Sequence, residues 1–362
     1  MKRLIATMLL FCLLPAYASG ETIRFSADLH VGSHAPEESA IVEAMLALPP
    51  EEGVLLLLGD LTNSGRPEEH AALIAQLKSA RARGATVYVL PGNHDMSVLS
   101  AQEFAALYAD FGYAAAFSRD ETSLSYAVAA GNGLWLAMLD TCVYGEAGGM
   151  FRASTQQWLT ALLQRAQAQG VRVIAAGHHP ILPHSYREES RSDLTVRGEQ
   201  LAALLRAYQV PVYLAGHRHI GHYAAEQRLT EILAGTPMLW PNKLGELTAA
   251  EGLRFTTRTL SVGQERFAEA SWERLQTQAA EMAVGALEET PFAGDAQMIA
   301  LFQTVYCAYR DGTLWRVRDA CLADLAYSRW QDERIRSIFR PWMRYLLETM
   351  TEDYNLWVQE RE

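Results

Sequence analysis

Five short polar motifs, each placed directly after an aliphatic run, constrain this sequence more than any other feature. In chain order they are Asp28-Leu29-His30, Gly59-Asp60-Leu61-Thr62, Gly92-Asn93-His94-Asp95, Gly177-His178-His179-Pro180 and Gly216-His217-Arg218-His219. The aliphatic runs are typical of buried strands. Because chain reversals at strand ends can present side chains without disturbing a sheet, we expect the five motifs to converge on one site.

The side chains in these motifs indicate a metal centre. Carboxylate oxygens and imidazole nitrogens bind divalent ions such as Mn, Fe or Zn, and a shared carboxylate can bridge two ions. Burying six or seven such groups without partners would be costly. All ten histidines lie between His30 and His222, so they belong to one part of the chain. One motif alone would be weak evidence, since an isolated Gly-Asn-His-Asp is more often a turn.

The first two thirds of the chain have the pattern of a layered α/β domain, predicted over residues 21–263. The predicted strands are 22–27, 54–58, 86–90, 124–129, 134–139, 171–176 and 210–215. Amphipathic stretches between several of them predict helices. One such helix begins at Pro67 and ends before Gly84, and another ends before Gly170.

Residues 264–362 have a different pattern, which predicts an all-helical second domain without strands. Apolar residues recur at helical spacing over 299–309 and 314–325, with a turn at Asp311-Gly312 between them. Pro341 should kink or divide the helix that follows. This domain could cover the substrate pocket, mediate dimerisation or bury one side of the first domain, and we favour the last two functions.

The N-terminal residues 1–20 have the composition of a signal peptide. Lys2 and Arg3 precede the apolar run 4–14, and Ala16-Tyr17-Ala18 provides small residues for cleavage. The apolar run is shorter than the roughly 20 residues that a membrane-spanning helix needs. We therefore expect an exported protein, periplasmic, cell-surface or extracellular, without a stable membrane anchor.

The net charge of the chain limits the kinds of partner that it can bind. A formal net charge of −11 argues against binding of long nucleic acids, which are held by clustered Lys and Arg. Small anionic substrates remain compatible if metals supply positive charge.

After the leader only Cys142, Cys307 and Cys321 remain, so no disulfide framework is expected. A bridge between Cys307 and Cys321 is conceivable, but we favour two buried thiols.

In this order the motifs resemble those of the calcineurin-like metallophosphoesterase superfamily, D-x-H, G-D-x-x, G-N-H-[DE], H and G-H-x-H, over residues 21–222. The resemblance implies a β-sandwich flanked by helices. It also implies a ligand set for two metal ions: Asp28, His30 and His219 for the first, Asn93, His178 and His217 for the second, and Asp60 between them. His94 would then approach the scissile phosphate without binding metal, and Asp95 would orient it. In the alternative interpretation, His94 only caps the turn.

This resemblance implies phosphate-ester hydrolysis by two divalent ions, whose bridging hydroxide attacks while His94 assists the leaving alcohol, with no organic cofactor. Asn63 stands where purple acid phosphatases have a tyrosine ligand, and the G-D-x-V-D-R-G motif of protein phosphatases is absent. The motifs are most similar to those of class III cyclic-nucleotide phosphodiesterases, so we expect a phosphodiesterase, with 3′,5′-cyclic nucleotides as candidate substrates.

Two alternative functions remain. One is a secreted phosphatase or glycerophosphodiesterase that scavenges small phosphate esters. The other, from another class, is a catalytically silent metal-binding interaction module. A homodimer is conceivable but has no support in the sequence.

Several further polar residues carry weaker expectations. His179 could contact substrate or only support a ligand through a hydrogen bond. A polar loop with His184, Tyr186 and Arg187 could line a substrate pocket. His34, His70 and His222 are expected at the surface or as supporting groups.

Overall fold

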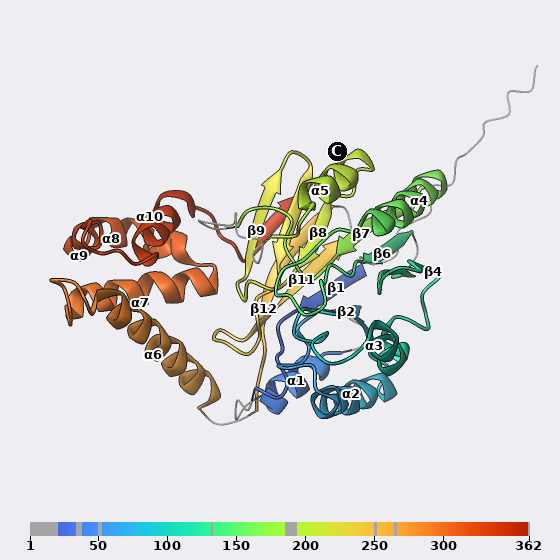
Figure 1. Cartoon of the computed structure of the whole chain (residues 1–362), viewed down its shortest axis with the longest axis horizontal. Helices are drawn as coiled ribbons and strands as arrows, with labels where there is room; N and C mark the ends of the chain where they lie inside the picture. The colour runs from blue at the N-terminus through green and yellow to red at the C-terminus, as the bar shows by residue number, and fades with distance from the viewer. Residues whose placement is uncertain are drawn as a thin grey trace, which may run out of the picture.

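The chain folds around two mixed β-sheets packed face to face (Figure 1). The computed structural model describes residues 21–33, 38–49, 53–131, 133–184, 194–249, 252–263 and 266–360. Phe25 and Leu56 of one sheet share a single buried cluster with Leu136 and Ile174 of the other. The layered sandwich that the sequence predicts is therefore confirmed, whereas the proposed signal peptide lies outside the described residues.

The first sheet has six strands in the order β13-β12-β11-β1-β2-β3. Their bounds are Glu21–Ser26 for β1, Val54–Leu58 for β2, Thr86–Leu90 for β3, Lys243–Ala249 for β11, Leu253–Thr259 for β12 and Leu356–Gln359 for β13. Strands β1, β2 and β3 are parallel, and β11 pairs antiparallel with β1. The carboxyl ends of the three parallel strands consequently meet at one edge.

The second sheet has seven strands in the order β4-β5-β6-β7-β8-β10-β9. Their bounds are Ser118–Arg119 for β4, Tyr126–Ala129 for β5, Leu134–Met138 for β6, Arg172–Ala176 for β7, Val212–Ala215 for β8, His222–Glu226 for β9 and Leu229–Leu233 for β10. Its central strands β6, β7, β8 and β10 are parallel. Like the first sheet, it therefore presents several strand ends at one edge.

Helices cover the outer faces of both sheets. Helices α1 (Glu38–Leu46), α2 (Pro67–Ala82) and α3 (Ala101–Leu107) pack with the core that contains β1 to β3. Helices α4 (Ala153–Gln169) and α5 (Gly198–Ala207) pack on the second sheet. Helix α4 ends at Gly170, which has a left-handed φ of 64°, as expected for a glycine that terminates a helix.

The C-terminal region is a group of five helices at one side of the sandwich (Figure 1). They are α6 (Phe267–Leu287), α7 (Ala296–Asp311), α8 (Leu314–Ala323), α9 (Leu325–Trp330) and α10 (Phe339–Thr349). Pro341 lies in the first turn of α10, where its missing N–H needs no intrahelical partner, so the expected division occurs before that helix. The domain boundary predicted between residues 263 and 264 adjoins residues that are not described and stays a prediction.

The prediction of an all-helical C-terminal domain is wrong in one respect. Strand β13 returns to the first sheet and pairs antiparallel with β12, joining Phe255 to Trp357. Its four residues alternate between exposed and half-buried positions because it is an edge strand, and so short a segment gives little periodic signal. Cys307 and Cys321 are buried free thiols, as favoured from the sequence.

Candidate metal centre

The five polar motifs lie immediately after five strands. Those after β1, β2 and β3 come from the first sheet, and those after β7 and β8 come from the second. The backbone ties the loops together, since the N–H of Asp28 donates to Gly59 and the N–H of His30 donates to the Asp60 carbonyl, both at 3.0 Å. The motifs therefore converge at the edge where the carboxyl ends of both sheets meet.

Most of the predicted ligands have an unusual backbone conformation. Five of the seven adopt a left-handed φ, at 57° for Asp28, 46° for His30, 48° for Asp60, 68° for His217 and 55° for His219. Such angles cost non-glycine residues about 1–3 kcal/mol each and persist only where the surroundings enforce them. Concentration of strain in these loops is typical of a functional site.

The first predicted ligand group is brought together. Side-chain ligand atoms of Asp28, His30, Asp60 and His219 all lie within 4.8 Å of one another. The Nε2 atoms of His30 and His219 are 3.1 Å apart, and His219 Nε2 is 3.5 Å from Asp28 Oδ1. Asp28 is also oriented by the loop after β8, because its carboxylate accepts the N–H of His217 at 3.0 Å.

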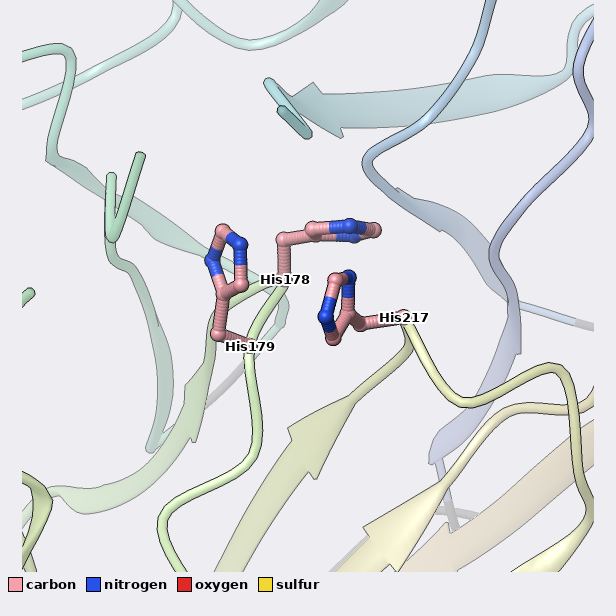
Figure 2. Close-up of side chains that lie close together, drawn as sticks. All are labelled: His178, His179 and His217. Atoms are coloured by element: carbon pink, nitrogen blue, oxygen red, sulfur yellow. The ribbon is translucent and has the colours of Figure 1, made fainter. Parts of the chain in front are cut away.

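The second predicted group surrounds His178. Its Nε2 lies 3.1 Å from Asn93 Oδ1 and 3.3 Å from Asp60 Oδ2. The other ring nitrogen, Nδ1, lies 2.8 Å from the Leu58 carbonyl, which accepts its proton and thereby directs Nε2 into the site. The His217 ring centroid is 5.1 Å from that of His178 (Figure 2).

Asp60 lies between the two groups. Its Oδ2 faces His178 at 3.3 Å and His30 Nε2 at 3.9 Å, while Oδ1 accepts the backbone N–H of His94 at 2.9 Å. This is the placement expected of a carboxylate shared by two ions. The structure thus brings together all seven predicted ligands, and their assignment as ligands stays a prediction.

His179 also lies beside His178 and His217, as Figure 2 shows, and its ring could be taken for a further ligand. Both its nitrogens are engaged, however. Nδ1 is 2.8 Å from the Thr141 hydroxyl, and Nε2 lies 3.1 Å from the Ala147 carbonyl. Because a carbonyl only accepts, Nε2 carries the proton and Nδ1 accepts from Thr141. Both ring nitrogens of His179 are thus used by Thr141 and Ala147, neither of which is a predicted ligand, so neither alternative that the sequence left open is confirmed.

His94 is oriented differently from the sequence-based expectation. Its Nδ1 lies 2.6 Å from the carbonyl oxygen of Asn63, and its ring is 4.6 Å from the His30 ring. Asp95 instead accepts the N–H groups of Leu61, Thr62 and Gly92 at 2.9–3.1 Å. Asp95 thus ties two motif loops together, and Asn63, through its backbone, holds the His94 ring. Sequence reasoning missed this function of Asn63 because a main-chain carbonyl carries no residue-type signal.

The electrostatics of the cluster fit bound cations. Burial raises the pKa of the Asp28 carboxyl well above its usual value. Burial also opposes ionisation of Asp60, but the neighbouring histidines, His178 foremost, together outweigh it and hold the pKa of Asp60 below its usual range. Burial lowers the pKa of His30 to about 4 and that of His219 to about 3, which keeps both imidazoles neutral and able to bind metal. Two buried carboxylates, the neutral imidazoles of His30 and His219 and an amide oxygen form a donor set suited to divalent ions. Burial lowers the pKa of His178, but Asp60 outweighs burial together with Asp28 and raises it to about 9, so a metal ion would have to displace that proton.

Comparison with known families identifies the chain. Residues 22–221 match the model of the calcineurin-like phosphoesterase family, a segment that contains all five motifs. The chain belongs to this family. It is the family that the order of the five motifs predicted.

Two curated relatives and one solved structure are similar to this phosphoesterase. A 3′,5′-cyclic-nucleotide phosphodiesterase from Nostoc sp. is 29% identical over 180 residues, 50% of this chain and 60% of the relative. A glycerophosphodiester phosphodiesterase from Enterobacter lignolyticus is 26% identical over 49% of this chain and 60% of its own length. A dimetal phosphatase from Danio rerio aligns with a TM-score of 0.55 at 15% identity, covering 68% of this chain and 98% of that one, and supports the fold.

The remaining histidines of this phosphoesterase lie outside the two ligand groups. His70 is buried, with Nδ1 2.9 Å from the Tyr108 hydroxyl. The His184 and His222 side chains are both buried, with their Nδ1 atoms 2.9 Å apart. His34, Tyr186 and Arg187 lie outside the described residues. In the part of the chain that is described, no helix is long and apolar enough to cross a membrane.

Proposed function

We propose that this protein is a phosphodiesterase with two divalent metal ions. The observation that carries the proposal is the position of Asp60, whose Oδ2 faces His30 of the first ligand group and His178 of the second. Asp28, His30 and His219 would hold the first ion, and Asn93, His178 and His217 the second. A pair of Mn, Fe or Zn ions fits this mixture of nitrogen and oxygen donors.

When bound, two such ions supply a hydroxide nucleophile at neutral pH and neutralise the oxygens of the phosphate. The protein contributes the geometry. The Leu58 carbonyl fixes the His178 ring, and the loop N–H groups that Asp95 accepts fix the spacing between the second and third motifs. These contacts hold the ligands before substrate arrives, which lowers the reorganisation that the reaction requires.

His94 is the proposed general acid. Its Nδ1 proton is donated to the Asn63 carbonyl, so Nε2 is the nitrogen that can reach a leaving alcohol. The His94 ring lies against that of His30, so it would be near the first ion if His30 binds one. As an imidazolium, with a proton on each nitrogen, His94 would give its Nε2 proton to the departing oxygen and be left as the neutral ring, which makes the alcohol a better leaving group.

Phosphodiesters are the proposed substrate class because both curated relatives are named phosphodiesterases. Their names point to 3′,5′-cyclic nucleotides and to glycerophosphodiesters, and the motif resemblance favours the former. Since the match spans 60% of each relative, substrate choice for the whole chain is part of this proposal. We also propose export by residues 1–20, which N-terminal sequencing of the mature protein would test.

The proposed function is tested by loading purified protein with Mn²⁺, Zn²⁺ or Fe²⁺ and comparing four substrates. They are bis-(p-nitrophenyl) phosphate, p-nitrophenyl phosphate, 3′,5′-cyclic AMP and glycerophosphoethanolamine, each with a chelated control. We expect metal-dependent turnover of the diesters. Turnover of the monoester alone would overturn the diesterase proposal, and absence of turnover with two ions bound would favour a silent metal-binding module.

A further inference from the structure

The C-terminal helices contact the loop that carries His219. Arg310, in the last turn of α7, donates from one terminal guanidinium nitrogen to the backbone carbonyl of His219 at 2.7 Å. Its other terminal nitrogen donates to the Tyr306 hydroxyl at 2.8 Å, and the guanidinium lies 5.1 Å from the centre of the Tyr306 ring. Tyr306 precedes Arg310 by one helical turn, so α7 itself holds the guanidinium in position.

The end of α7 is in turn fixed to the first sheet. Lys243 of β11 forms an ion pair with Asp311 and donates to the Asn355 amide oxygen at 3.0 Å. The Asn355 amide nitrogen donates to the Asp311 carbonyl at 2.8 Å. These three residues come from β11, from α7 and from the segment before β13. Because Asp311 follows Arg310 directly, this cluster holds Arg310 at a constant distance from the sandwich.

The surroundings of Arg310 argue for contact with the loop and against contact with substrate. The cavity beside it, lined by His219, Thr236, Trp240 and Asp311 among others, has a volume of about 30 Å³. Such a volume accommodates one or two water molecules and excludes a phosphate ester. Arg310 therefore acts on the backbone of His219, through the carbonyl, rather than on a bound substrate.

His219 needs such support. Its left-handed φ of 55° is unfavourable for a histidine, yet this conformation directs its Nε2 toward His30 and Asp28. A charge-assisted hydrogen bond to its carbonyl stabilises that conformation more strongly than a neutral one would. We propose that Arg310 is a positioning residue that holds His219 in its ligating conformation, so that the C-terminal helices set the affinity of the first metal position. The inference rests on the proposed function only in assuming that Asp28, His30 and His219 bind an ion.

The test compares Arg310→Gln with the wild-type full chain by calorimetric titration of metal-free protein with Mn²⁺. We expect the wild type to bind two ions, and the variant to bind one of them about 10–100-fold more weakly, the range typical of lost supporting contacts. The second ion should bind with unchanged affinity, and excess Mn²⁺ should restore most of kcat. Arg316→Gln is the matched control, since Arg316 is an exposed arginine of α8 that lies over Trp315.

A milder variant guards against misfolding. Tyr306→Phe keeps the ring and removes only the hydroxyl that holds the guanidinium, so it should weaken the same ion by a few fold without lowering the melting temperature of the metal-free protein. Unchanged Mn²⁺ affinity in both variants, with two ions bound by the wild type, would overturn this inference alone. A wild-type chain that binds no ion would overturn the proposed function and the inference with it.

Discussion

At the scale of single residues, the predicted ligands are side chains, whereas the groups that orient them are mostly backbone atoms. The seven predicted ligands were identifiable because their residue types occur in a fixed order after strands, and the structure brings them together. The orienting groups are mostly backbone atoms, such as the Leu58 carbonyl beside His178 and the Asn63 carbonyl beside His94. Any residue type supplies a carbonyl, so sequence reasoning could not have found them.

His94 is not one of the predicted ligands, and the first prediction follows from this. His94→Ala should lower kcat for a diester by about 10²–10⁴-fold, the usual contribution of a general acid. Its metal content should remain at the wild-type value, because the Asp60 contact uses the His94 backbone N–H, which alanine keeps. Steady-state kinetics and elemental analysis of the same sample would check both parts.

His178→Ala serves as the comparison for this variant. It removes an imidazole that lies 3.1–3.3 Å from Asn93 and Asp60, so metal content and activity should fall together. Loss of metal in His94→Ala, at a level similar to His178→Ala, would contradict the assignment of His94 as a group that does not bind metal.

Glu231 gives a prediction about pH. This carboxyl is completely buried, accepts the N–H of Ile181 at 2.9 Å and lies 3.3 Å from His184 Nε2. Burial raises its pKa from 4.5 to about 8, although the N–H groups of Ile181 and Leu182 oppose the shift. Because the folded chain binds this proton more tightly than the unfolded chain, the stability that it contributes is complete below about pH 4.5 and is lost as pH rises toward 8.

Glu231→Gln should therefore flatten the pH dependence of stability. The wild type should lose roughly 2 to 4 kcal/mol of unfolding free energy between pH 5 and pH 8 that the variant does not lose. Urea unfolding at several pH values in that interval measures the difference. Parallel curves for the two proteins would show that Glu231 is ionised throughout, with its charge balanced by a protonated His184.

At the scale of elements, the sequence was most informative where a buried strand is followed by a motif. Strands β2 and β3 begin and end as predicted. The first is a continuous aliphatic run, and the second alternates buried Val87 and Val89 with the more exposed Thr86 and Tyr88. Strands β9 to β13 were not predicted. They mix polar and apolar residues, as in the partly exposed β9 and β12. Two of them, β11 and β13, also pair with strands distant in sequence, β1 and β12, and local periodicity carries no signal of such pairing.

Gly59, in the loop after β2, lies close to the His178 ring in the loop after β7. It has a φ of 85°, and a Cβ there would lie 2.7 Å from His178 Nδ1 and from the Gly92 nitrogen. Gly59→Ala should displace the His178 ring and destabilise the fold by several kcal/mol, about 1–3 from backbone strain and the rest from overpacking. Thermal unfolding of the metal-free protein and its Mn²⁺ affinity would both be measured.

Gly145→Ala is the matched control. Gly145 has nearly the same φ, 83°, but a Cβ there would have no atom within 4 Å. It should therefore show only the backbone cost and wild-type metal binding. Equal effects of the two substitutions would mean that the spacing between the second motif and His178 is not a constraint on the site.

At the scale of the whole molecule, the metal centre should contribute to stability because it joins loops from both sheets. Saturation with Mn²⁺ at a hundred times its dissociation constant should stabilise the folded chain by about 2.7 kcal/mol for each site, and EDTA should remove this gain. Differential scanning calorimetry would measure the shift in melting temperature. Asp60→Asn, which weakens the residue between both ligand groups, should lose most of the shift, and an undiminished shift would argue against a shared carboxylate.

The last prediction concerns the C-terminal helices. They share one buried cluster with the second sheet, their Trp272 ring lies 4.5 Å from that of Trp240, and β13 completes the first sheet. We therefore expect the two regions to unfold in one transition, despite their different secondary structure. Trp330 tests this because it is completely buried among the helices, with Nε1 donating to the Met298 carbonyl at 2.9 Å.

Trp330→Ala should destabilise the helices by about 3–5 kcal/mol. If the two regions are coupled, the whole transition moves to lower temperature, and metal binding at the distant site is lost at that same lower temperature. Trp315→Ala is the control, since Trp315 is 39% exposed and its loss should cost far less. A calorimetric trace with two peaks, of which Trp330→Ala shifts only one, would show that the helices unfold independently of the sandwich. In that case Arg310 would support His219 only at temperatures at which the helices are still folded.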